Sequence, residues 1–128
     1  MAVTNTSDFL PTGGIAEVAQ MTSANGISES ADLIVGHAEG KRIKEIRVFS
    51  GQTNPIPAGT VLVLKLFDGT NSRTIGSAIC PGGADTLQAF FAFNNLFLPT
   101  VAHAFRAQLR TPLASGATLD FTFIGEEF

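Results

Sequence analysis

The residues that could do chemistry are few in this chain, and they form no recognisable catalytic or metal-binding pattern. His37 and His103 lie far apart, and neither has a second ligand at the spacing of known metal sites. Cys80 is the only cysteine, which excludes an internal disulfide and a cysteine-based metal site. The sequence therefore predicts two structural or surface histidines and a small buried or half-buried thiol without chemistry.

The carboxylates also lack a catalytic arrangement. Most of them fall at turns or at outward strand positions, among them Asp8, Glu17, Asp32, Glu39, Glu45 and Asp120. The glycine pairs Gly13-Gly14 and Gly82-Gly83 match neither a phosphate-binding loop nor a dinucleotide fingerprint. We therefore expect a protein that is not an enzyme, needs no cofactor or metal and has no small-molecule substrate.

The composition points to apolar surfaces that need covering. The 128 residues suit one domain, of which 45% are apolar and only 15% charged, against ~25% charged in typical soluble domains. No apolar run approaches the ~20 residues of a membrane helix, and a net charge of −3 disfavours nucleic acid as a partner. The start of the chain lacks the pattern of a secretory signal, and the single cysteine fits synthesis in a reducing cytoplasm.

All 11 aromatic residues are Phe, and Trp and Tyr are absent. Phe suits dry packing because its ring brings no polar group that needs a partner. Surfaces that recognise sugars or varied proteins tend to use Tyr and Trp. This choice of aromatics predicts Phe in a core and in permanent contacts between chains.

Short extended segments separated by turn residues fill the chain from Ile15 onward. Strands are expected over residues 15–21, 32–39, 42–49, 61–67, 72–80, 86–98, 103–110 and from 118 onward. This spacing predicts an all-β fold: a single-domain antiparallel β-sandwich, jelly-roll-like, of about eight strands over residues 15–128. Residues 1–14 read as a flexible N-terminal arm, in which Phe9 and Leu10 are either anchors or part of a disordered end.

Local irregularities are expected at three places. The apolar residues Ile43, Ile46 and Val48 miss a period of two, which predicts a bulge near Lys44 or Glu45. A second bulge or corner is expected at residues 94–95, where two Asn interrupt a long extended run. The segment 68–71, with the sequence DGTN, predicts a hairpin turn.

The segment VLVLKLF, residues 61–67, is apolar on both faces. Leu62, Leu64 and Leu66 share one face, and the other face carries Val61, Val63, Lys65 and Phe67. A solvated antiparallel strand normally has one polar face. Val61, Val63 and Phe67 therefore face either a neighbouring chain or a second sheet of the same chain.

The segment KRIKEIR, residues 41–47, is the most basic part of the chain. Lys41, Arg42, Lys44 and Arg47 surround Glu45. Charges of this kind often protect a solvated strand face or a sheet edge. The alternative interpretation is a basic patch that docks on an acidic protein surface.

From about residue 41 to its end, the sequence resembles a family of small proteins from tailed bacteriophages and prophages. The family pattern is a basic strand, a hairpin with a DGTN turn, an AF strand, an LxLP strand end, an LR strand and a final strand with a Gly-acidic tail. Here these segments read RIKEIRV, LFDGTNSR, QAFFAF, LFLP, AQLRT and FTFIGEEF. The sequence departs from the pattern after LFLP, where similar proteins often have Gly-Trp or Gly-Tyr and this chain has TVAHAF.

The resemblance implies a non-enzymatic β-sandwich virion protein, and within that class a capsid decoration (cement) protein. Such proteins bind the major capsid protein on the outer capsid surface, often as a homotrimer. Two other roles stay open: a tail, baseplate or head-tail connector component, and a sugar-binding jelly roll, which the missing Trp and Tyr disfavour.

Overall fold

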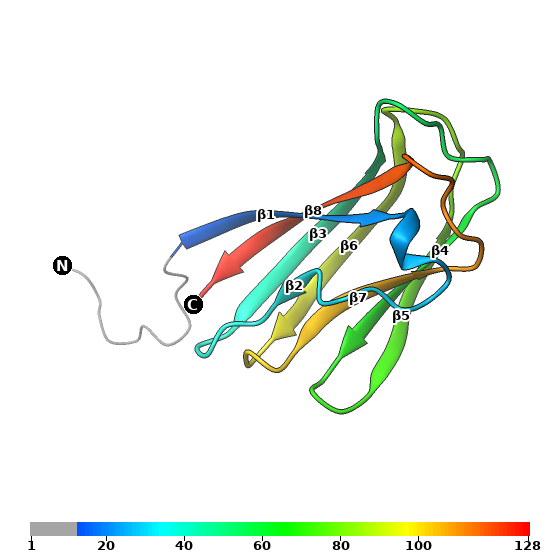
Figure 1. Ribbon diagram of the computed structural model, residues 1–128. Coiled ribbons are helices and arrows are strands. Elements are labelled where there is room, and N and C mark those ends of the chain that lie inside the picture. The colour runs from blue at the N-terminus through cyan, green and yellow to red at the C-terminus, as the bar shows by residue number, and fades with distance from the viewer. Residues whose placement is uncertain (1–12) are drawn as a thin grey trace.

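The order of the strands in space identifies the topology of this chain. The computed structural model describes residues 13–128, which form two four-stranded antiparallel sheets, β1-β8-β3-β6 and β2-β7-β4-β5 (Figure 1). The strands are β1 (Gly13–Thr22), β2 (Ile34–Val35), β3 (Lys41–Ser50), β4 (Val61–Phe67), β5 (Ser72–Ile79), β6 (Leu87–Leu98), β7 (Ala104–Leu109) and β8 (Thr118–Glu127). A single turn of 3-10 helix, η2 (Ser23–Asn25), follows β1.

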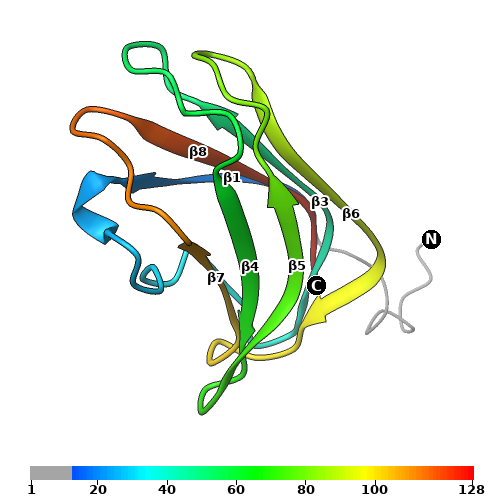
Figure 2. The ribbon, with the colours of Figure 1, turned by 90° about the vertical axis from the view of Figure 1, so that its right-hand side faces the viewer.

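The strand pairs match a long hairpin that has been rolled up. β1 pairs with β8, β2 with β7, β3 with β6 and β4 with β5, so each pair joins strands equally distant from the two ends of the series. Every connection except the β4–β5 turn therefore crosses from one sheet to the other, and the sheets form two layers (Figure 2). This arrangement is an eight-stranded jelly roll, which confirms the predicted fold class.

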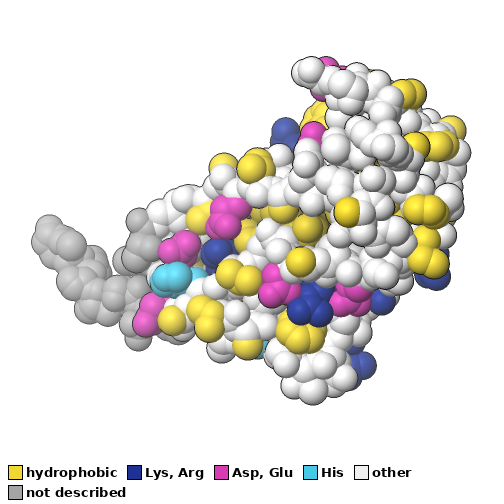
Figure 3. Space-filling model, in the orientation of Figure 1, with side chains coloured by type: hydrophobic (Ala, Val, Ile, Leu, Met, Phe, Trp, Pro, Cys, Tyr) yellow, Lys and Arg dark blue, Asp and Glu magenta, His cyan; other side chains and the backbone are white. Residues whose placement is uncertain are grey.

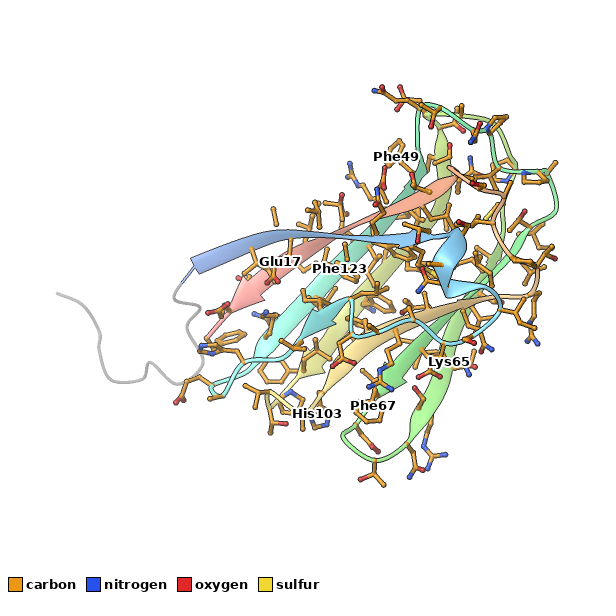
Figure 4. All side chains as sticks on the ribbon, in the orientation of Figure 1. Glu17, Phe49, Lys65, Phe67, His103 and Phe123 are labelled. Atoms are coloured by element: carbon orange, nitrogen blue, oxygen red, sulfur yellow. The ribbon has the colours of Figure 1, made fainter. Side chains whose placement is uncertain are left out.

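Phenylalanine fills the space between the sheets. Phe105 on β7 stacks on Phe123 of β8 with ring centroids 5.8 Å apart, and Phe121 and Phe93 extend the stack. Phe105, Phe121 and Phe123 have no exposed surface, and Phe123 lies between the two layers (Figure 4). Leu62 and Leu64 of β4 join the same core, as their alternation predicted.

The irregularities expected from the sequence are confirmed. Lys44 is an extra residue of β3 against β8, because Ile43 pairs with Gly125 while Glu45 pairs with Ile124. Residues 93–95 of β6 oppose the same single residue of β3. At the β4–β5 turn, the carboxylate of Asp68 accepts hydrogen bonds from the backbone N–H groups of residues 70 and 71, which lower the pKa of this carboxyl.

Two strand predictions need correction. The strand expected over residues 32–39 is limited to β2, because residues 37–40 form a turn in which the Gly40 backbone N–H donates to the His37 carbonyl. The Gly36 backbone N–H still donates to the carbonyl of His103, one position beyond the last β2–β7 pair. β1 begins at Gly13, two residues before the predicted start. Phe9 and Leu10 lie outside the described residues.

Gly125 lies opposite the bulge, where the packing leaves no room for a side chain. A Cβ at this position would overlap the Arg42 carbonyl oxygen and lie 3.0 Å from the Ile43 Cα, and neither backbone atom can move without breaking the ladder. Gly125→Ala is expected to lower the free energy of unfolding by about 2 kcal/mol or more. Gly13→Ala is the control, because no atom lies within 4 Å of the added Cβ. Equal thermal stability of the two variants would contradict this assignment.

Candidate functional site

A charged cluster covers the outer face of the sheet β2-β7-β4-β5. Glu29, from the connection between η2 and β2, accepts hydrogen bonds from Ser72 Oγ at 2.6 Å and Arg106 Nη1 at 3.2 Å. Its second carboxylate oxygen lies 3.5 Å from Lys65 Nζ. Arg106 Nε donates to Asp32 Oδ1 at 2.6 Å. We call Glu29, Asp32, Lys65, Ser72 and Arg106 the Arg106 cluster; in Figure 3, acidic and basic side chains form a row across this face.

An aromatic ring forms the floor of the Arg106 cluster. The Arg106 guanidinium carbon lies 3.7 Å from the centroid of the Phe67 ring, a close cation–π contact. Phe67 and Lys65 both lie on the outer face of β4 (Figure 4). The guanidinium is thus held by two carboxylates and one ring, a geometry that the planar, permanently charged Arg side chain suits.

Hydrogen bonds keep the cluster ionised. The Ser72 hydroxyl has the largest effect and, with Arg106 and Lys65, lowers the pKa of Glu29 against the opposing effect of burial. The hydrogen bond to Asp32 raises the pKa of Arg106. Each of these side chains contacts another member of the cluster, and together they fasten residues 29–32 across β4, β5 and β7.

The same connection explains the apolar second face of β4. Val63 is only 3% exposed, and its neighbour in register, Gln108, donates a hydrogen bond to the backbone carbonyl of Ile27. Val63 therefore has no free surface for a neighbouring chain and drops out of the candidate interface. Val61 and Phe67 remain partly exposed. A crossing segment and its ion pairs, rather than a second sheet, cover most of this face.

Lys41 has a structural position in the basic segment 41–47. Only 5% of this residue is exposed, and its Nζ lies 2.9 Å from Glu17 Oε2 on β1 and 2.8 Å from the carbonyl oxygen of Val35 on β2. These contacts join strands of the two sheets at the end where β1 begins. Loss of Glu17 would leave this buried ammonium group without its counter-charge, and Lys41 has little surface to offer a partner protein.

The other cations of this segment are paired on the outer face of the sheet β1-β8-β3-β6. Arg42 Nη2 and Lys44 Nζ both contact Glu126 Oε1, at 3.0 and 3.2 Å, and they lower the pKa of Glu126. Arg47 Nη2 lies 2.7 Å from Glu45 Oε1. The segment is therefore largely neutralised by its own chain, which favours the interpretation as a solvated strand face over the acidic-partner interpretation.

A group of exposed apolar residues was not recognised from the sequence. Phe49 of β3 pairs in register with Leu87 of β6, and Phe90 of β6 pairs with Arg47. The exposed fractions of Phe49, Leu87 and Phe90 are 40%, 45% and 49%, respectively. We call them the Phe90 patch. Phe49 lies near the far end of β3, away from Glu17 and His103 (Figure 4). The available signal was the absence of any charge in residues 87–98.

The remaining candidate residues have structural contacts. His37 Nε2 lies 3.3 Å from Glu127, and His103 Nδ1 lies 2.8 Å from the Thr100 hydroxyl. Cys80 is fully buried, and burial raises the pKa of its thiol, which makes it unreactive. Within residues 13–128, no three His, Cys, Asp or Glu side chains are grouped to hold a metal ion, and no helix is long and apolar enough to cross a membrane.

No protein-family model matches this sequence, and no curated protein matches it significantly.

The Arg106 cluster predicts a pH-dependent loss of stability. Because folding lowers the pKa of Glu29 below its usual 4.5, its stabilising contribution is complete above that pH and is lost as the pH falls through the folded-state pKa. Glu29→Gln is expected to lower the free energy of unfolding by about 1–2 kcal/mol at pH 7, and by progressively less below pH 4.5.

Urea denaturation between pH 3 and 8 measures this difference. Glu39→Gln is the matched control, because the Glu39 carboxylate forms no ion pair with the part of the chain that the structure describes. An effect of Glu29→Gln that stays constant with pH, or one equal to the control, would show that the cluster contributes little.

Proposed function

We propose that this protein is a non-enzymatic structural component of a tailed-phage virion, which decorates and stabilises the outer capsid surface as a homotrimer bound to the major capsid protein. The observation that carries the proposal is the combination of internally paired charges with exposed apolar side chains. The Arg106 cluster and the Glu126 pairs neutralise much of the charge of this chain on its own surface. Meanwhile Val18, Phe49, Leu87 and Phe90 remain exposed.

This combination suits permanent assembly. Interfaces of obligate complexes are more apolar than those of transient ones, and their centres are poor in charged residues. A symmetric trimer on a shell also makes each contact several times, so that a modest contact per copy adds up to tight binding. The jelly roll itself occurs in capsid proteins and in lectins, so the fold does not distinguish the two roles. The absence of Trp and Tyr and the internally paired charges favour the structural role.

Cryo-electron microscopy of virions tests the proposed location. Density for this jelly roll on the icosahedral threefold or quasi-threefold axes of the head is the expected result. Density confined to one vertex or to the tail would instead assign the protein to the tail, the baseplate or the head-tail connector. Complete absence from purified virions would overturn the structural role.

The N-terminal segment supplies a second test of shell binding. We propose that residues 1–12, through Phe9 and Leu10, lie along a capsid subunit or a neighbouring protomer. Burial of one Phe and one Leu contributes on the order of 3–5 kcal/mol before the entropy cost of ordering the segment is subtracted. Deletion of residues 2–12 leaves β1 intact, since β1 begins at Gly13. The expected result is a folded oligomer that binds expanded, undecorated heads at least tenfold more weakly.

A double substitution distinguishes the effect of the two apolar side chains on head binding from the effect of the segment's length. Phe9→Ser combined with Leu10→Ser should weaken head binding about as much as the deletion, whereas Thr4→Ser combined with Thr6→Ser should not. Occupancy of the heads is measured by sedimentation followed by gel densitometry. Wild-type occupancy after the deletion would show that this segment has no role in binding.

A further inference from the structure

We propose that the Phe90 patch and the adjoining free edge of β6 are the contact between copies of this chain. The proposal rests on the proposed function in one respect, since it assigns a surface to the expected homotrimer. In such a trimer, the patches of the three copies meet around the threefold axis and exclude water there.

The patch is a compact apolar surface at one corner of the sheet. Phe49 and Leu87 are direct cross-strand neighbours, and Phe90 lies on the same outer face beside Arg47. With exposed fractions of 40–49%, the three side chains offer on the order of 250 Å² of apolar area per copy. A stable interface covers about 800 Å² per partner, so the patch supplies an apolar centre that a more polar rim must surround.

The edge next to the patch lacks the charged side chains that commonly protect a sheet edge. β6 is the last strand of its sheet and, although twelve residues long, has no charged side chain. The other long edge strands each have a charge: Glu17 on β1 and the exposed Arg73 on β5. Proteins commonly place charges on edge strands to prevent association, so an uncharged edge beside exposed Phe and Leu indicates a surface that is covered in the assembled state.

A second copy is the occupant that the surrounding charges allow. Arg47 and Glu45 beside the patch are paired at 2.7 Å, and Arg47 also lies over the Phe90 ring, 5.8 Å from its centroid. Asp120 of β8, which pairs in register with Phe49, accepts a hydrogen bond from Gln20. Each of these charges therefore has a partner within its own chain, so that two copies can meet without an unpaired charge at the contact. A strongly acidic or basic partner would find no unpaired charge among them to bind.

The apolar pair of the chain's own N-terminal segment, Phe9 and Leu10, lies too close to β1 in the sequence to cover the patch. β1 begins level with Lys41, because Gly13 and Lys41 both pair with Glu127. Phe49 is eight residues further along β3, about 26 Å away at the rise of a strand. Phe9 is four residues from Gly13, so its reach is at most about 14 Å. Phe9 and Leu10 therefore cannot reach the patch of the same copy.

Sedimentation equilibrium of the purified full-length chain tests the proposal. The variant combines Leu87→Asn with Phe90→Ser, and Val18→Ser is the control because Val18 is 77% exposed on the same sheet, two strands away from the patch strands. The wild type and the control should be trimers at 10 μM, and the patch variant should associate at least tenfold more weakly with unchanged circular dichroism. A patch variant that stays trimeric, or a wild type that is monomeric at 100 μM, would overturn the proposal.

Cross-linking provides a readout that does not depend on weakened packing. Phe90→Cys places a thiol at the patch, whereas the native Cys80 is buried and should not react. Mild oxidation should give disulfide-linked dimers of Phe90→Cys and none of Val18→Cys. If Phe90→Cys formed no more disulfide-linked dimer than Val18→Cys, the patches of different copies would not meet.

The head-binding assay separates this proposal from the proposed function. If the patch variant stays trimeric and binds heads normally, the assigned contact is wrong and the decoration role remains supported. A patch variant that is monomeric, while the wild-type trimer does not bind heads, would support the contact and argue against decoration. If deletion of residues 2–12 alone abolishes the trimer, the patch is occupied by a neighbour's N-terminal segment, and direct contact between the sheet faces is wrong.

Discussion

The ion pairs within the chain are the constraint on which the rest of this structure depends. The connection between β1 and β2 contains η2, and its residues 26–33 lie across the outer face of a sheet without helix or strand structure. Glu29 and Asp32 hold it there through Arg106, whose guanidinium stacks on Phe67. Lys41 performs a similar role between the sheets, where it joins Glu17 to the carbonyl of Val35.

These pairs decide what remains for other molecules to bind. A chain with only 15% charged residues that uses many of them in its own contacts has few left to keep its surface hydrated. The outer face near β6 consequently presents phenylalanine and leucine to solvent, next to an edge without charge. In an isolated protein such a surface invites aggregation, whereas in a symmetric assembly it supplies the apolar centre of the contact. The proposed role in a capsid shell follows from this distribution together with the family resemblance.

The sequence was sufficient to predict the fold class, because period-two alternation is strong wherever a strand has one buried face, as in Leu119, Phe121 and Phe123. It also located the bulge at Lys44 from the broken alternation of β3. It could not predict that Val63 would be buried by the connection after η2, since the covering contacts join residues far apart in sequence, such as Arg106 and Glu29. The Phe90 patch was missed for the same reason: its exposure depends on β6 being an edge strand, which only the pairing order reveals.

The central claim is that assembly of this chain covers its β6 face. Hydrogen–deuterium exchange at different protein concentrations tests this claim most directly. The exchange of peptides covering residues 87–98 is compared with that of residues 13–22, which form the other edge strand of the same sheet. The account predicts that raising the concentration from the monomeric to the assembled range slows exchange in residues 87–98 and leaves residues 13–22 unchanged. Slower exchange in residues 13–22 alone, or no change in residues 87–98 on assembly, would contradict it.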